Sequence, residues 1–286
     1  MEYSTSYKCQ NYRDISLLNT CYKLYANILR LKLQPVSETI LLEEQCGFRK
    51  GRSCIDAIFT LKQIMEKKRE FNEPLYLLFL DYEKAYDRVN RKKLWDVLYQ
   101  YRIDANLINA IKSLYKNNKI LIKTNNKTTS NTIQINRGLR QGCGLSPLLF
   151  DLYINMIIEK WALHNPKGIY ITREKQISTI LFADDQLLLT ESEENLQRSV
   201  NALNKIAKEF DMKISSEKTK SMALYGKQQR RVKIVVDDKI IEQVSSFDYL
   251  GCKISIEQMN ADLERNMTKY NKLNGCIKKY FGKNMR

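Results

Sequence analysis

The chain has 286 residues and carries 48 lysines and arginines against 32 aspartates and glutamates, which gives a formal net charge of +16. Its hydrophobic content of 43% is enough for a packed core in one large domain or two smaller ones. The positive charge favours polyanionic partners, chiefly nucleic acid. No apolar run approaches the roughly 18 residues of a membrane-spanning helix, and the N-terminus lacks the apolar core of a signal peptide. We therefore expect a soluble intracellular protein.

Cysteine and histidine are too sparse and too scattered to suggest a metal or disulfide framework. The seven cysteines are an odd number without a C-x-x-C pair, and His164 is the single histidine. A zinc site, a set of disulfides and a histidine-dependent hydrolase are all disfavoured by this pattern. The thiols are expected to be reduced packing residues.

The first third of the chain predicts two helices, a buried strand and a third helix. Apolar residues recur at helical spacing over residues 17–33 and 54–69. Residues 75–80 are continuously apolar, as in a strand buried on both faces, and Asn90 suits the N-cap of the next helix. Asp81 therefore stands where a core strand ends.

A carboxylate at the edge of a buried strand is poorly solvated and needs a partner. Asp81 is predicted to form an ion pair, for which Lys84 is a candidate, or to bind a metal ion. Both interpretations are open from this segment alone.

A basic, glycine-rich segment follows in the middle of the chain. Three glycines lie within residues 138–144, and they allow a ligand to approach the backbone closely. Ser146 and Pro147 predict the N-cap and first turn of a helix that runs to about Trp161. A loop of this kind before a helix suits contact with phosphate or nucleotide, although an ordinary glycine turn has the same pattern.

Residues 179–190 are two apolar runs that meet at Asp184 and Asp185. This pattern predicts a β-hairpin with two carboxylates at its tip, since such runs flank tight turns. Aspartate is common in turns, so the pair alone is also compatible with a purely structural role. Adjacent carboxylates that do bind a ligand favour a divalent cation and phosphoryl chemistry. Beyond the hairpin the pattern predicts one more helix and two strand regions, over residues 196–210, 233–241 and 247–256.

Seven segments in order resemble the reverse transcriptase domain of LINE-type (non-LTR) retrotransposons, and the resemblance extends along nearly the whole chain. The matching segments are residues 11–19, 44–53, 81–87, 137–150, 182–185, 216–220 and 249–252. They look like two fingers motifs, the first aspartate motif, the Gln-Gly motif, the aspartate hairpin, the late palm lysine motif and the primer grip.

The resemblance implies an α+β fold, a right-hand polymerase with fingers and palm, in which an antiparallel palm sheet packs on helices. Residues 1–74 would be N-terminally truncated fingers, 75–256 the palm with some fingers elements, and 257–286 the start of a thumb or a tail. The implied activity is RNA-directed DNA polymerisation, in which two Mg²⁺ or Mn²⁺ ions assist the addition of deoxynucleotides to a primer 3′ end.

The resemblance also implies roles for individual residues. The catalytic set would be Asp81, Asp184 and Asp185 as metal ligands, with Asp185 the least direct, and Lys218 as proton donor to pyrophosphate. The nucleotide-binding set would be Arg13, Lys23, Tyr86, Gln141 and Gly142, with Tyr86 as the steric gate against ribonucleotides. The nucleic-acid-binding set would be Arg49, Arg52, Tyr249, Leu250 and Gly251. Lys23 and Lys218 could instead be solvated surface lysines, and Tyr86 a buried aromatic.

The implied partners are an RNA template, a DNA primer and deoxynucleoside triphosphates. The chain has neither the endonuclease region nor the complete thumb of the family, so we expect it to be part of a longer polyprotein. The alternative is a truncated relic that binds nucleic acid without catalysis. An RNA-templated RNA polymerase shares the palm chemistry but is disfavoured by Tyr86. A nuclear location is implied only by the family's priming at chromosomal DNA.

Overall fold

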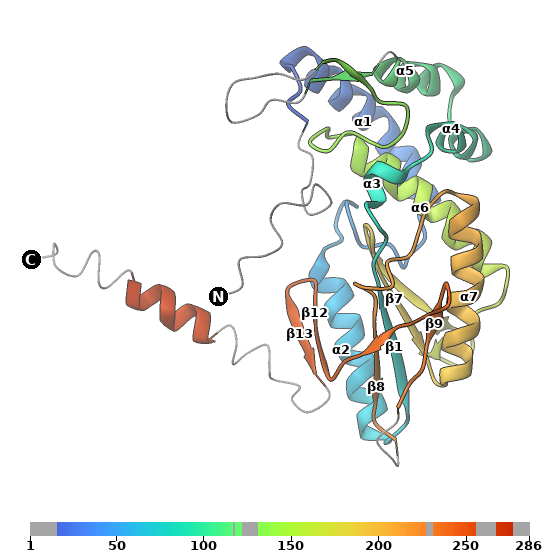
Figure 1. The fold of residues 1–286 in the computed structure, drawn as a ribbon, viewed down its shortest axis with the longest axis vertical. Coiled ribbons are helices and arrows are strands. Elements are labelled where there is room, and N and C mark those ends of the chain that lie inside the picture. Colours follow the sequence, from blue (N-terminus) through green and yellow to red (C-terminus); the bar gives the residue numbers. More distant parts are fainter. Residues whose placement is uncertain (1–15, 117, 122–130, 227–230, 256–266, 277–286) are drawn as a thin grey trace, which may run out of the picture.

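The computed structural model describes residues 16–116, 118–121, 131–226, 231–255 and 267–276. A sheet flanked by helices forms one part, and a cluster of helices forms the other, beyond one end of the sheet (Figure 1). This arrangement agrees with the predicted α+β class. Within the described ranges, no helix is both long and apolar enough to cross a membrane.

The central sheet has five strands in the order β11-β8-β1-β7-β6. Their bounds are β1 (Leu75–Leu80), β6 (Thr179–Phe182), β7 (Asp185–Thr190), β8 (Lys220–Leu224) and β11 (Glu242–Gln243). All neighbours are antiparallel except β11 and β8, which run parallel. Strand β1 lies in the middle and all six of its residues are buried, which confirms the strand predicted from its continuous apolar run.

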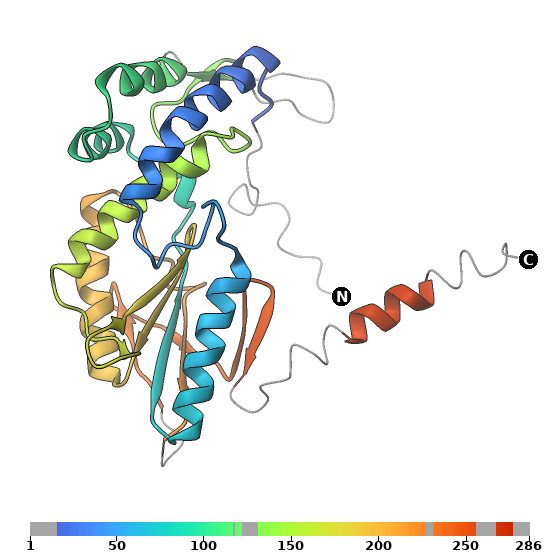
Figure 2. The ribbon, with the colours of Figure 1, turned by 180° about the vertical axis from the view of Figure 1, so that it is seen from behind.

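Helices cover both faces of this sheet (Figures 1 and 2). The odd-numbered residues of β1 pack in a core with α2 (Cys54–Glu70), and the even-numbered residues pack in a larger core with α6 (Ser146–Ala162) and α7 (Glu193–Glu209). This follows from the alternation of side chains along a strand. Each fully buried leucine of β1 contributes roughly 1.5 to 3 kcal/mol to stability.

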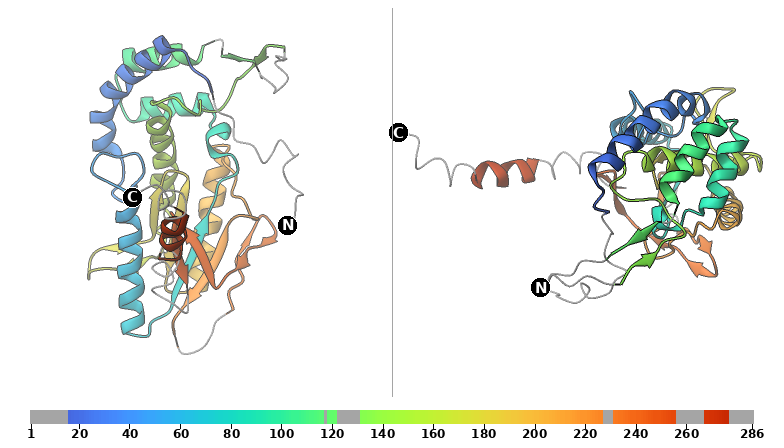
Figure 3. Two further views of the ribbon diagram at one scale, coloured as in Figure 1. Left: turned by 90° about the vertical axis from the view of Figure 1, so that its left-hand side faces the viewer. Right: turned by 90° about the horizontal axis from the view of Figure 1, so that it is seen from above.

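The helical part consists of α1 (Thr20–Ile40), α3 (Ala85–Arg88), α4 (Arg91–Gln100) and α5 (Ala105–Tyr115), gathered around the first half of α6 (Figures 1 and 3). Of the 17 residues of α6, 13 are buried, because α1, α4 and α7 all pack against it. Helix α6 therefore joins the helical part to the sheet.

Two helix boundaries differ from the sequence-based predictions. Helix α1 begins at Thr20, because the Asn19 side chain accepts a hydrogen bond from the Tyr22 N–H at 2.7 Å, and it continues through Pro35 to Ile40 instead of ending near residue 33. Ser146 was predicted as the N-cap of α6 but is its first residue, after Leu145. Its hydroxyl lies 3.3 Å from the buried Tyr115 hydroxyl, so the Ser146 side chain makes a contact in the core and does not cap the helix.

Four small hairpins complete the fold, and they include the strand regions predicted near the C-terminus. They are β2 (Lys119–Ile120) with β3 (Ile133–Gln134), β4 (Ile169–Tyr170) with β5 (Gln176–Ile177), β9 (Val235–Val236) with β10 (Lys239–Ile240), and β12 (Ser246–Tyr249) with β13 (Cys252–Ser255). Of the expected thumb region 257–286, the structure describes only residues 267–276, which are helical and mostly exposed. The structure describes six of the seven cysteines, and among these six it has no disulfide.

Candidate active site

The sheet brings Asp81 to the tip of the β6–β7 hairpin. Strands β1 and β7 pair up to Leu80 and Gln186, so Asp81 follows β1 directly after the last pair, and Asp185 precedes Gln186 in β7. Residues opposite each other in an antiparallel pair have Cα atoms about 4.5 to 5.5 Å apart. Asp81 and Asp185, which are 104 positions apart in the chain, therefore lie at the same end of the sheet, next to the last pair of β1 and β7.

The hairpin turn itself is unusually constrained. Phe182 pairs with Asp185, which leaves Ala183 and Asp184 as a two-residue turn. Ala183 has a φ of 57°, a left-handed conformation that costs an L-residue roughly 1 to 2 kcal/mol. The buried Gln45 side chain holds this conformation, because its Oε1 accepts hydrogen bonds from the N–H groups of Ala183 at 3.2 Å and Gly47 at 2.9 Å.

Gly47 allows the loop of Gln45 to come this close. A Cβ atom at position 47 would lie 2.4 Å from the backbone nitrogen of Ala183. The same loop exchanges backbone hydrogen bonds with the hairpin, from Cys46 N–H to the Leu181 carbonyl at 2.8 Å and from Leu181 N–H to the Glu44 carbonyl at 2.9 Å. Residues 44–47 thus form a support beneath the turn that presents Asp184.

The carboxylates of Asp184 and Asp185 affect the pKa values of different tyrosines. Burial is the main cause of the raised pKa of Tyr86, and the negative charges of Asp151 and Asp184 add to it. The pKa of Tyr249 is also raised chiefly by burial, and there the charges of Asp185 and then Cys46 add to it. Asp184 therefore lies on the side of α3 and α6, and Asp185 on the side of the β12–β13 hairpin.

Lys218 is the ion partner of Asp81. Its Nζ lies 3.7 Å from Asp81 Oδ1, while 67% of the Lys218 side chain remains exposed. The turn that carries Lys218 is bound to the Asp81 backbone, because Ser215 N–H donates to the Asp81 carbonyl at 2.8 Å and Asp81 N–H donates to Thr219 Oγ1 at 3.3 Å. The ion pair that sequence analysis considered for Lys84 thus forms with Lys218, from the late lysine segment.

Tyr86 lies on the same side of the hairpin as Asp184. Its ring stacks on Phe150 of α6, with the ring centroids 4.5 Å apart and an interplanar angle of 11°. Its backbone carbonyl accepts a hydrogen bond from Leu139 N–H at 2.8 Å. The half-buried ring is therefore held by Phe150 of α6, and the backbone of Tyr86 is bound to the glycine-rich segment.

The other expected nucleotide-binding residues surround the start of α1. Ser16 N–H donates to the Gln141 carbonyl at 3.0 Å, and Gly142 is exposed with a φ of 96°, which favours glycine. Lys23 is exposed on α1. Arg13 lies outside the described residues.

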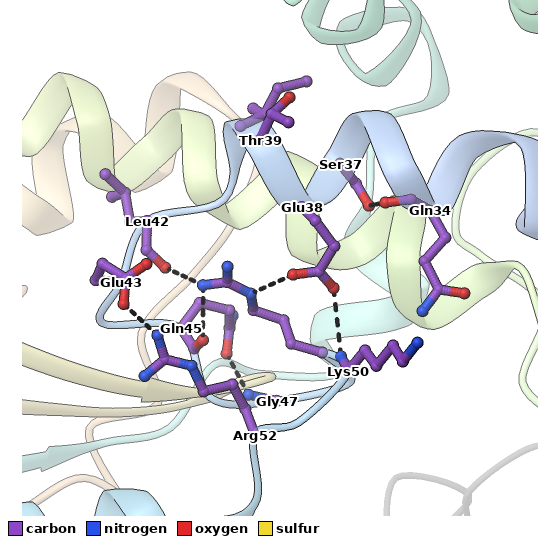
Figure 4. Close-up of polar contacts among 12 residues, drawn as sticks. Gln34, Ser37, Glu38, Thr39, Leu42, Glu43, Gln45, Gly47, Lys50 and Arg52 are labelled. Carbon is purple, nitrogen blue, oxygen red and sulfur yellow. Dashed lines mark hydrogen bonds and ion pairs between the residues drawn. The ribbon is translucent and has the colours of Figure 1, made fainter.

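Arg49, which is expected to contact nucleic acid, has its side chain engaged within the protein. Only 7% of its side chain is exposed, and it donates hydrogen bonds to the Glu38 carboxylate at 3.1 Å and the Leu42 carbonyl at 2.8 Å. Figure 4 shows this network, in which Glu38 also accepts from the Lys50 N–H and Arg52 pairs with Glu43. Arg49 thus binds the loop that follows α1 to the end of that helix, whereas Arg52 is exposed.

The expected primer-grip segment forms the β12–β13 hairpin. Tyr249 is only 3% exposed and its ring lies 5.5 Å from that of Phe79, so a direct contact between this ring and nucleic acid is not supported. Leu250 and Gly251 form the turn with φ values of 49° and 82°. Gly251 is the exposed member of the three.

Sequence analysis missed two buried polar residues beside the hairpin, Gln45 and Asp151. Asp151 of α6 is 0% exposed, and within the described part of the chain neither carboxylate oxygen has a hydrogen-bond partner. Burial raises its pKa well above the usual value, with added effects from Glu38 and Asp184 against the opposing charge of Arg49. The available signal for Asp151 was an acid within an apolar run of its helix, whereas no sequence pattern indicates the partners of Gln45.

The donor set at the hairpin suits a hard divalent cation. Among the described residues, no three acidic, cysteine or histidine side chains are grouped closely enough to hold a metal ion by themselves. Mg²⁺ is usually held by one or two carboxylates together with water and substrate phosphates, so a complete protein cage is not required. Asp81 and Asp184 provide oxygen ligands of the right kind.

Comparison with known proteins agrees with this geometry. Residues 4–254 match the family described as reverse transcriptase (RNA-dependent DNA polymerase). The chain is 30% identical over 192 residues to the uncharacterized 149 kDa protein of transposon TX1 from Xenopus laevis, covering 66% of this chain and 14% of that protein. It is 28% identical over 252 residues to the Pol polyprotein of retrotransposable element R2 from Nasonia vitripennis, covering 84% of this chain and 24% of that protein.

The fold has counterparts among solved structures. Telomerase from Candida albicans, in complex with a fragment of telomeric RNA, superposes with a TM-score of 0.55 at 17% identity, covering 82% of this chain and 36% of that one. Apo telomerase from Candida tropicalis, truncated from the C-terminal domain, gives a TM-score of 0.54 at 18% identity, covering 82% and 43%. The chain thus belongs to the reverse transcriptase family, and its relatives include the non-LTR retrotransposon proteins that its motifs indicated.

Proposed function

We propose that this chain catalyses RNA-directed DNA synthesis, adding deoxynucleotides to the 3′ end of a primer on an RNA template. The observation that carries the proposal is the placement of Asp81 and the Asp184 turn at the same end of the sheet, with Lys218 paired to Asp81 and the charge of Asp184 acting on Tyr86. Membership of the reverse transcriptase family supports it.

Asp81 and Asp184 are the residues that we expect to hold divalent metal ions, Mg²⁺ or Mn²⁺ and two in number. When bound, such ions would lower the pKa of the primer hydroxyl and stabilise the negative charge that develops on the phosphates. Asp185 is a third candidate, and its position toward Tyr249 makes it the more indirect one. Lys218 would release its proton to the leaving pyrophosphate after separating from Asp81.

Tyr86 would decide which sugar is accepted. Its ring lies flat on Phe150, so it cannot swing away from an incoming nucleotide without losing that stacking. A 2′-hydroxyl that points at this ring would collide with it. Gln141 and Gly142 would line the same pocket, and Lys23, with Arg13, would contribute positive charge toward the triphosphate.

The proposed partners are an RNA template, a DNA primer and deoxynucleoside triphosphates. The net charge of +16 supports a polyanionic partner, and Arg52, Leu250 and Gly251 are the expected contacts nearest the surface. In this proposal the N-terminal helices up to residue 74 belong to the fingers, the region 75–256 is mainly palm, and 257–286 begins the thumb. The chain spans 14% of its TX1 relative and 24% of its R2 relative, so other regions of a longer polyprotein would act with it.

Primer extension by the purified chain tests the proposal. With an RNA template, a DNA primer and deoxynucleotides, we expect extension in Mg²⁺ or Mn²⁺ that a chelator abolishes. A chain that is folded by circular dichroism and binds template-primer but incorporates nothing with either ion would contradict the proposal. That result would instead support the alternative of a non-catalytic nucleic-acid-binding relic.

A further inference from the structure

Arg91, the first residue of α4, is a buried cation that the proposed function leaves unused. The residue is 8% exposed, and among the described residues no carboxylate lies within ion-pair distance of its guanidinium. A positive charge at a helix N-terminus also opposes the helix dipole. Burying a charged side chain costs free energy, so the contacts that compensate the charge of Arg91 indicate its role.

Three backbone carbonyls of the glycine-rich segment compensate the charge. Arg91 donates from Nη1 to the Ile135 carbonyl at 2.7 Å, from Nε to the Gly138 carbonyl at 2.9 Å and from Nη2 to the Arg137 carbonyl at 3.1 Å. The guanidinium carbon also lies 4.9 Å from the centre of the Tyr115 ring. A planar fork with five donors can bind three convergent carbonyls, whereas a lysine ammonium cannot match this geometry.

The loop that Arg91 holds is in turn bound to the helical turn that carries Tyr86. Leu139 N–H donates to the Tyr86 carbonyl and Gly138 N–H to the Val89 carbonyl, both at 2.8 Å. Gly138 lies against this turn so closely that a Cβ atom there would be 2.9 Å from the Asp87 carbonyl oxygen. Gln141 and Gly142 come shortly after this segment. The Arg91 guanidinium therefore fixes the loop that connects Tyr86, on one side of the proposed nucleotide pocket, with Gln141 and Gly142 on the other.

We propose that Arg91 is a positioning residue for nucleotide selection, which sets the distance between Tyr86 and the Gln141–Gly142 loop and thereby the exclusion of ribonucleotides. The inference rests on the proposed function. Its physical basis is that a displacement of about 1 Å in such a pocket can change a rate by roughly 10²-fold. Arg91 acts through the backbone of residues 135–139 and touches no nucleotide itself.

Single-nucleotide incorporation kinetics with deoxy- and ribonucleotides provide the first test. We expect Arg91→Met to reduce the ratio of deoxy- to ribonucleotide kcat/KM by at least about tenfold, mainly through KM, and Arg91→Lys to restore part of it. Arg102→Met, at an exposed position just after α4, is the matched control and should leave the ratio unchanged. In a Tyr86→Ala background Arg91→Met should cause no further loss of selectivity. If the double variant instead loses the selectivity of both single variants in full, the two residues act independently and the proposal is overturned.

Hydrogen exchange in the free chain tests the same coupling without turnover. In Arg91→Met we expect peptides covering residues 85–90 and 135–140 to exchange at least about tenfold faster, while peptides from β1 keep the parental rate. If Arg91→Met does not fold, Gly138→Ala displaces the same loop with Arg91 intact and should also raise exchange over 85–90. Exchange that is unchanged in these peptides, or raised equally everywhere, contradicts the inference. If Arg91→Met shows the faster exchange but the parent chain does not polymerise, the coupling stands and only the proposed function is refuted.

Discussion

The side-chain oxygen of Gln45 accepts a hydrogen bond from the backbone N–H of Ala183, although 138 positions separate the two residues. The same oxygen accepts from the Gly47 N–H, and the Gln45 side chain is buried. The left-handed Ala183 is thus held by a residue from the fingers motif. The conformation that presents Asp184 depends on a contact between two parts of the chain that are distant in sequence.

Replacing this acceptor should destabilise the protein. Gln45→Met keeps the length of the side chain but leaves two buried N–H groups without a partner, each at a cost of about 1 to 3 kcal/mol. We expect the free energy of unfolding, measured by urea denaturation, to fall by roughly 2 to 4 kcal/mol. Gln63→Met, at an exposed position of α2, is the control and should stay within about 0.5 kcal/mol. Equal stability of the two variants would show that the Gln45 contact is unimportant.

Gly47 should not tolerate a methyl group. A Cβ atom would lie 2.4 Å from the Ala183 nitrogen, so Gly47→Ala must push the loop and the hairpin turn apart. We expect a loss of about 1 to 3 kcal/mol in thermal or urea unfolding. At Gly144 a Cβ atom would meet no atom within 4 Å, so Gly144→Ala should be neutral or slightly stabilising. A Gly47→Ala protein as stable as the parent would mean that the hairpin tip is not tightly supported.

Asp151 should make stability depend on pH. Its pKa is raised by burial, so the folded chain still binds this proton at pH values where the unfolded chain has released it. Because the folded state binds more protons, the contribution of Asp151 to stability falls as pH rises from the usual carboxyl pKa toward the raised one. Asp151→Asn removes this titration and should raise the free energy of unfolding at pH 7 by roughly 1 to 3 kcal/mol.

The pH profile distinguishes this cause from simple repacking. The advantage of Asp151→Asn over the parent should shrink as the pH is lowered toward 4, where the folded carboxyl is protonated and the unfolded one becomes protonated as well. Asp96→Asn, at an exposed position of α4, provides the control and should show no such trend. A stability difference that is constant between pH 4 and 8 would refute a buried titrating acid.

The sequence predicts the elements whose signals are local. The apolar run gives the bounds of β1, Asn90 caps α4 through the N–H groups of Lys92 and Lys93, and the apolar runs around Asp184 form the hairpin. These features depend on neighbouring residues, so periodicity and capping rules capture them.

The remaining features depend on contacts between distant parts of the chain. Arg49 looked like a surface cation because Glu38, its partner, stands 11 positions away on α1. Arg91 is bound by carbonyls 44 to 47 positions later, which no sequence pattern predicts. Ser146 matched the pattern of an N-cap, but the nearby Tyr115 hydroxyl engages it instead. Local patterns cannot distinguish these outcomes, because tertiary packing decides them.

Lys218 is predicted to matter for chemistry more than for stability. Most of its side chain is exposed, so Lys218→Gln should change the free energy of unfolding by no more than about 0.5 kcal/mol. If Lys218 donates a proton, Lys218→Gln and Lys218→Arg should both slow incorporation by roughly 10²-fold, since arginine keeps the charge but cannot release its proton. Lys213→Gln, which removes an ion pair to Glu83, is the control. A parental rate in Lys218→Arg would leave Lys218 only the role of a positive charge beside Asp81.

We expect the Asp184 carboxylate at the hairpin tip to be required for catalysis and not for binding. The most direct measurement compares the rate of single-nucleotide incorporation, at saturating template-primer and deoxynucleotide, in the parent, Asp184→Asn and the control Asp96→Asn. Asp184→Asn should lower the rate by roughly 10³-fold or more while template-primer affinity stays within about twofold, and Asp96→Asn should equal the parent. Incorporation by Asp184→Asn at the parental rate would contradict this expectation.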